Sequence, residues 1–164
     1  MIRAAHAAYL TALGLWVGAM ASLGFIVAPT VFRTTPSRLL AGTIFGAVLQ
    51  RFGPVQIALG VICLAALTAL CAGGVLRGRR AVIHIGGIAI MLALVLVSHL
   101  YLAPEIVRER EAIANFDSVP PGVPAKARFD RLHRTSVQLA VGTLILGAGL
   151  LVCAAWTSRP ADGS

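Results

Sequence analysis

The stretch that decides the fold is AVIHIGGIAIMLALVLVSHLYLAP, which runs from residue 81 to residue 104. It contains no Asp, Glu, Lys or Arg, and it exceeds the roughly 20 residues that an α-helix needs to cross a hydrocarbon core of about 30 Å. Residues 4–32, 52–76 and 135–158 are uncharged in the same way. Backbone amides inside lipid must be paired within their own segment, so these continuous apolar runs predict helices and not the alternating strands of a barrel. We expect four spans, at about residues 5–28, 55–76, 82–103 and 136–157.

The composition supports a membrane protein. Of the 164 residues, 58% are hydrophobic and only 12% are charged, and the mean hydropathy is +0.87. A soluble domain carries about 25% charged residues, so both a soluble globular fold and a disordered chain are excluded. The fold class is all-α, an integral membrane four-helix bundle, with one domain over residues 1–158 and a disordered tail at 159–164. Three cysteines inside the spans predict buried thiols and no disulfide framework.

The first span resembles a signal peptide in its basic start, Arg3, and in Ala19-Met20-Ala21, a possible cleavage site. The apolar run nevertheless continues to Phe32, which is typical of a membrane anchor. We therefore expect this segment to remain as a span.

Charge sets the expected orientation. Four crossings put both termini and the turn at residues 77–80 on one face, where Arg77, Arg79 and Arg80 form the densest basic cluster. The opposite face holds more Lys and Arg in total, mixed with acidic residues, so the positive-inside rule gives conflicting answers. We favour cytoplasmic termini in a bacterial inner membrane. The net charge of +8 predicts affinity for anionic headgroups and requires no nucleic acid.

Two polar segments join the spans. Pro36 forbids helix continuation and Ser37 can cap a new helix, so residues 37–52 predict a short connector helix, either interfacial or an extension of span two bent at Pro54. Residues 104–134 predict a charged helix, a proline-rich break at 119–124, and a second charged helix leading into span four. This loop would form a polar cap whose arginines can bind a phosphate or a carboxylate.

Small residues at helix-packing spacing occur twice, as Gly14-x-x-x-Gly18 and Gly42-x-x-x-Gly46. Glycines let helix backbones approach closely in lipid, where little hydrophobic drive exists between helices. We expect these glycines to pack against a neighbouring helix, either within the bundle or in a homo-oligomer.

Four histidines form two pairs near the span ends. His6 and His84 open spans one and three, while His99 and His133 lie near the opposite face. Polar residues in membranes tend to face the bundle interior and mark sites, although a histidine at a span end often only caps a carbonyl. We expect the binding site at the face with the long loop. Its candidate residues are Arg33, His99, Tyr101, Arg108, Arg110, His133, Arg134 and Ser136.

The sequence contains several short motifs in a characteristic order. They are Trp16-x-Gly18, Val27-Ala28-Pro29-x-x-Phe32, Ala41-Gly42-x-x-Phe45, His99-Leu100-Tyr101, Pro104 with Arg108-x-Arg110, and Phe129-x-x-Leu132-His133-x-x-Ser136. From about residue 6 to residue 150 the chain resembles the transmembrane-protein-205-like family of domains of unknown function. That resemblance implies a four-helix membrane protein without an established activity. More distantly, His6 before Trp16-x-Gly18 is similar to the first span of the copper-resistance-D and protoporphyrinogen-oxidase-like bundles, where such a histidine can ligate haem.

Three classes of function remain open. No catalytic signature is present, so we favour a non-enzymatic bundle in envelope homeostasis or in protein or lipid interaction, with no cofactor. The first alternative is a haem- or copper-binding membrane protein that uses His6 and His84 or His99 and His133. The second is a small-solute transporter or channel, although the spans contain none of the carboxylates that a proton-coupled carrier normally uses.

Overall fold

The computed structural model describes residues 1–113 and 123–157, and every regular element in them is a helix. The predicted tail at 159–164 and most of the predicted break at 119–124 lie outside the described residues. In chain order the elements are α1 (Ile2–Ser22), η1 (Leu23–Val27), α2 (Ala28–Thr34), α3 (Arg38–Ala72), α4 (Gly78–Leu96), η2 (Val97–Leu102), α5 (Ala103–Glu111) and α6 (Pro124–Thr157). The elements η1 and η2 are wider π-helical turns.

These elements join into four long helices. The first three are Ile2–Thr34, Arg38–Ala72 and Gly78–Glu111, and the fourth is α6. Each is long and apolar enough to cross a membrane. The predicted fold class, an all-α bundle with four spans, is therefore confirmed.

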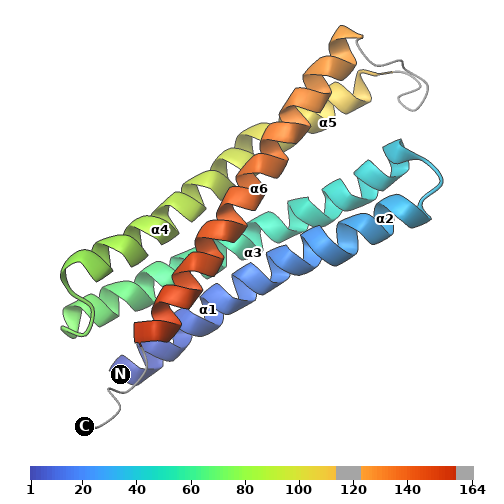
Figure 1. Cartoon of the computed structure of the whole chain (residues 1–164). Coiled ribbons are helices and arrows are strands. Elements are labelled where there is room, and N and C mark those ends of the chain that lie inside the picture. The colour runs from blue at the N-terminus through green and yellow to red at the C-terminus, as the bar shows by residue number, and fades with distance from the viewer. Residues whose placement is uncertain (114–122, 158–164) are drawn as a thin grey trace.

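The four helices form two antiparallel hairpins that close into a ring (Figure 1). Hairpin 1 contains α1, η1, α2 and α3, and hairpin 2 contains α4, η2, α5 and α6. Both α1 and α4 pack on both α3 and α6. The N-terminus, the end of α6 and the turn at residues 73–77 lie at one end, which we call the termini end. The opposite end, with the turn at residues 35–37, is the mouth end.

The turn between the hairpins depends on glycine. Gly74 and Gly78 have φ angles of 73° and 56°, in the left-handed region where a side chain would be strained. They let the chain reverse directly after α3 and start α4.

The connector at residues 37–52 is not a separate interfacial helix, so that alternative was wrong, and the other alternative, an extension of span two, is confirmed. It forms the first half of α3, which continues through Pro54. Ser37 caps this helix as expected, because its hydroxyl oxygen accepts a hydrogen bond from the Leu40 N–H at 3.0 Å. Proline removes one helical hydrogen bond, but α3 packs against α1, α2 and α4, which holds it helical through that point.

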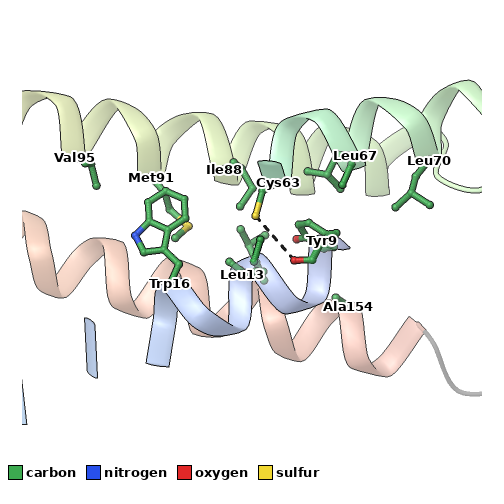
Figure 2. Close-up of a cluster of buried hydrophobic side chains, with 13 residues drawn as sticks. Tyr9, Leu13, Trp16, Cys63, Leu67, Leu70, Ile88, Met91, Val95 and Ala154 are labelled. Atoms are coloured by element: carbon green, nitrogen blue, oxygen red, sulfur yellow. Dashed lines mark hydrogen bonds between the residues drawn. The ribbon is translucent and has the colours of Figure 1, made fainter. Parts of the chain in front are cut away.

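The buried core occupies the half of the bundle near the termini end (Figure 2). Leu13, Trp16, Cys63, Ile88 and Met91 are completely buried there. The Trp16 indole Nε1 has no hydrogen-bond partner, and it points away from Tyr9. Of the three thiols only Cys63 is buried. Cys153 is exposed, so its predicted burial was wrong; none of the three cysteines forms a disulfide with another described residue.

The two hairpins repeat one another. A constant sequence interval pairs the buried Tyr9, Leu13 and Trp16 of α1 with the buried His84, Ile88 and Met91 of α4. The same interval pairs η1 with η2, and Ala28-Pro29 with Ala103-Pro104. The ring of contacts is consistent with a pseudo-twofold axis along the bundle that relates hairpin 1 to hairpin 2. Paired positions of α1 and α4 both lie in the shared core.

Candidate functional site

One face of α3 carries Gly46, Gly53 and Gly60 at heptad spacing, with Gly42 one turn before Gly46. Side chains of hairpin 2 lie against this face. A side chain at Gly60 would collide with Leu92, and one at Gly53 would collide with the His99 ring. Nearer the mouth end, a Cβ at Gly42 or Gly46 would lie 3.6 or 3.7 Å from Nη1 of Arg110.

The side chains on this glycine face become more polar toward the mouth end. The sequence Leu92, His99, Arg110 runs from the apolar interior to the polar end of the bundle. The glycines leave room against the helix for the His99 ring and the Arg110 guanidinium. The predicted glycine pair at 42 and 46 therefore does contact a neighbouring element, through the Arg110 side chain.

Arg110 differs from Arg108 and Arg128 in its side-chain partners. Arg108 pairs with Glu105 at 3.0 Å, and Arg128 of α6 pairs with Glu109 at 3.0 Å and with Glu105 at 3.8 Å. Within residues 1–113 and 123–157, the guanidinium of Arg110 has neither an ion pair nor a hydrogen bond, and the residue is half-buried. A guanidinium with free donors is suited to a carboxylate or phosphate oxygen.

The predicted cluster of His99 with His133 does not form in the described part of the chain. His99 is half-buried against Gly53 of α3, whereas His133 is exposed and stacks on Phe129 of its own helix, with ring centroids 6.0 Å apart. Consecutive helices do bring the two histidines to the same end, but their side chains point to different neighbours. The expected shared site of two histidines was wrong for this reason.

The remaining candidates are spread over the surface. Arg33, Tyr101, Arg108 and Arg134 are exposed, and Ser136 is half-buried. A shallow depression of about 310 Å³ is lined by Ala127, Asp130, Arg131 and Arg134. The structure therefore brings only Arg110 and His99 of the predicted mouth residues onto one common surface, the glycine face of α3.

At the termini end the structure does bring His6 and His84 together. Both line a small cavity of about 30 Å³, with Tyr9 as the third polar residue. The Tyr9 hydroxyl lies 2.8 Å from Nδ1 of His84, and the two rings meet edge to face at 5.7 Å. Both side chains are buried, so this hydrogen bond satisfies polar groups that lie inside the core.

Haem does not fit this cavity. A volume of about 30 Å³ suffices for one or two waters, because a water needs only on the order of 10–15 Å³ of such space. The cavity between His6 and His84 is therefore too small for a haem ring. No group of three His, Cys, Asp or Glu residues that could hold a metal occurs in residues 1–113 and 123–157.

The other predicted glycine pair does not pack within the bundle. Gly18 is exposed, and a Cβ at Gly14 or Gly18 would meet nothing within 4 Å. The expectation of a packed Gly18 was wrong for contacts inside this chain, because α1 turns Tyr9, Leu13 and Trp16 to the core instead. Packing of this face in a homo-oligomer stays a prediction.

Sequence reasoning missed Gly53 and Gly60 as packing positions and Tyr9 as the partner of His84. A signal for the glycines was present, because Gly46, Gly53 and Gly60 recur at heptad spacing, which places them on one side of a helix. No local pattern marks the hydrogen bond between Tyr9 and His84, since its partners lie in different hairpins.

Four helices of spanning length arranged in a ring, with a basic mouth end, define a multi-pass membrane bundle. A family model described as "Domain of unknown function (DUF4149)" matches residues 11–115. The match covers more than half of the chain, and the chain belongs to this family. It includes the glycine face of α3, His84, His99 and Arg110, whereas His6, Tyr9 and α6 lie outside it. Comparisons with curated proteins and with solved structures found no match.

Proposed function

We propose that this chain is a non-enzymatic membrane protein that binds an anionic group, a lipid headgroup or a small acid, at Arg110. The observation that supports it is the half-buried guanidinium resting on Gly42 and Gly46 without an acidic partner in the described residues. Its neighbours Arg108 and Arg128 are neutralised by Glu105 and Glu109. Arg110 is therefore the cation of α5 that is open to an external anion.

The setting of Arg110 is consistent with a ligand that arrives from the membrane. The glycine face that carries Arg110 continues into the spanning part of α3, where His99 covers Gly53. We further propose a place in the bacterial inner membrane with cytoplasmic termini, a role in envelope homeostasis, and membership of the transmembrane-protein-205-like group. The motifs quoted above and the arginine turn at 77–80 support these assignments.

Thermal unfolding in detergent tests the anion site. The melting temperature of the parent protein should rise with added short-chain phosphatidylglycerol, with inorganic phosphate, or with both, because a ligand that binds only the folded state stabilises it. A rise with the lipid alone identifies a headgroup, and a rise with phosphate as well identifies a general anion site. Arg110→Gln should weaken the response about 10- to 100-fold in ligand concentration, which is the loss of about 1.5–3 kcal/mol for a charge-assisted hydrogen bond.

The matched control is Arg108→Gln, which removes an equal charge from the same helix at a residue that already pairs with Glu105. It should leave the ligand response almost unchanged. Equal responses of the two variants would contradict the site, because binding would then reflect total charge only.

A further inference from the structure

The tips of the two hairpins reach the same level at the mouth end but differ in chemistry. His99 lies on Gly53, and the Arg110 side chain of α5 reaches Gly42 and Gly46 in the first half of α3. We define the tip of hairpin 1 as residues 29–51 and the tip of hairpin 2 as residues 103–113 and 123–135. The two tips can therefore be compared as surfaces at the same depth relative to the membrane.

Both tips extend beyond the hydrocarbon core. About 20 helical residues cover its 30 Å, and counted from the turn at the termini end they reach about residue 52 of α3 and residue 98 of hairpin 2. Arg51, Glu105 and Arg134 are the first charged residues beyond this level on three of the long helices. From Arg51 to Arg38, α3 continues for about 20 Å at 1.5 Å per residue.

The tip of hairpin 2 has the surface expected for water. Its ion pairs join Arg128 of α6 to Glu105 and Glu109 of α5. Among the described residues of this tip, Val123 at 39% is the only exposed large hydrophobic side chain.

The tip of hairpin 1 has the opposite character. Large apolar side chains are exposed on it, and their exposed fractions range from 37% to 45%. They are Phe32, Leu39, Leu40, Ile44 and Leu49. Several exposed apolar side chains beyond the hydrocarbon core mark a contact with another molecule.

The charge around this apolar surface is of one sign. Arg33, Arg38 and Arg51 are all exposed at the tip of hairpin 1. The sequence contains no Asp or Glu from residue 1 to residue 77, so no carboxylate side chain of hairpin 1 can neutralise them. An apolar surface surrounded by arginines matches the boundary between acyl chains and anionic headgroups.

We propose that anionic lipids cover the tip of hairpin 1, so that the leaflet rises along Leu40 and Ile44 of α3 while the tip of hairpin 2 remains in water. A second copy of the chain is a poor occupant, because its tip would bring the same three arginines against these. Lipids adapt to a longer apolar stretch at modest cost by local thickening. This surface is separate from the Arg110 site, since Leu40 and Ile44 lie on the side of α3 opposite Gly42 and Gly46.

Photocrosslinking shows what covers the tip. The photoreactive residue p-benzoylphenylalanine is placed at Ile44, and in a second protein at Ala127, which is exposed on α6 beside Arg128 at the hydrated tip. Both proteins are reconstituted in vesicles of phosphatidylcholine with phosphatidylglycerol, and adducts are identified by mass. The Ile44 position should yield lipid adducts and the Ala127 position should yield few or none, with fewer adducts at Ile44 in phosphatidylcholine alone.

Three results would overturn the inference. Equal, low lipid yields at both positions would mean that the tip of hairpin 1 is hydrated. Crosslinked dimers at Ile44 would assign the surface to a second copy, and equal lipid yield without phosphatidylglycerol would remove the role of the arginines. Leu40 provides a second position should the protein fail to fold with the probe at Ile44. Adding Arg110→Gln should leave the Ile44 adducts unchanged, so failure of the anion site and failure of this inference are distinguishable.

Discussion

Tyr9 connects the two hairpins through a buried hydrogen bond. Its hydroxyl lies 2.8 Å from Nδ1 of His84, and both side chains are buried. Tyr9→Phe keeps the ring but leaves the histidine without this partner, so the free energy of unfolding should fall by about 1 kcal/mol, in the range of interhelical hydrogen bonds in membrane proteins. Thermal unfolding in detergent measures the change.

The control for Tyr9 is the other tyrosine. Tyr101 is 74% exposed, and Tyr101→Phe should leave the melting temperature almost unchanged. Equal effects of both substitutions would mean that the hydrogen bond to His84 contributes nothing to stability.

Gly53 is the position where a single methyl group should do most damage. Its missing side chain is the space that the His99 ring occupies, so Gly53→Ala forces the ring and η2 away from α3. Overpacking of this kind costs about 1–3 kcal/mol. The melting temperature of Gly53→Ala in detergent should therefore fall.

Gly18→Ala is the matched control for Gly53, since a Cβ there meets nothing within 4 Å. It should be neutral or slightly stabilising, because alanine favours the helix by about 1 kcal/mol. A loss of stability at Gly18 in a monodisperse monomer would contradict the outward orientation of that face.

At the residue scale, the sequence predicted which side chains are candidates for a site better than which residues they contact. It singled out Arg110, His6 and His84 because charged and titratable side chains are rare in an apolar chain. The partner of His99 was not predictable, because the helix face that presents Gly53 depends on the rotation of α3 in the bundle. His133 lies at the expected end of α6 yet faces outward, for the same rotational reason.

At the scale of elements, α5 and α6 are joined by ion pairs. Glu109 is only 12% exposed and pairs with Arg128 at 3.0 Å. Glu109→Gln should lower the free energy of unfolding by about 1 kcal/mol or less, the upper range for such pairs, and the loss should shrink at high salt, which screens the charges. Glu111→Gln removes an exposed charge from the same helix and should have a smaller effect in a melting experiment at low salt.

The spans could be predicted because charge-free runs report directly on membrane insertion. The sequence left the continuity of α3 as one of two alternatives, since Pro54 normally weakens a helix and the packing that compensates it comes from α1, α2 and α4. The charged segments at 104–113 and 126–134 were predicted as helical. The structure adds that both continue the spanning helices without interruption, α5 through η2 and the other as the start of α6.

At the scale of the molecule, the antiparallel ring places the turn at residues 73–77 and the end of α5 at opposite ends of the bundle. Reporter fusions at Arg80 and at Val123 should therefore report opposite sides of the membrane. With cytoplasmic termini, the Arg80 fusion should be active with a cytoplasmic reporter and the Val123 fusion with an external one. If both fusions reported the same side of the membrane, four crossings would be contradicted. If the Arg80 fusion were external and the Val123 fusion cytoplasmic, only the proposed orientation would be reversed.

The buried, unbonded indole of Trp16 has an optical consequence. Trp16 is completely enclosed by the core and its Nε1 has no hydrogen-bond partner, whereas Trp156 near the end of α6 is 73% exposed. An excited indole in rigid apolar surroundings has no polar neighbours that can reorient around it, so Trp16 emits at shorter wavelength than Trp156. Trp16 thus reports the integrity of the core, and Trp156 reports the surroundings of the termini end. The difference between their emission wavelengths disappears when the bundle unfolds.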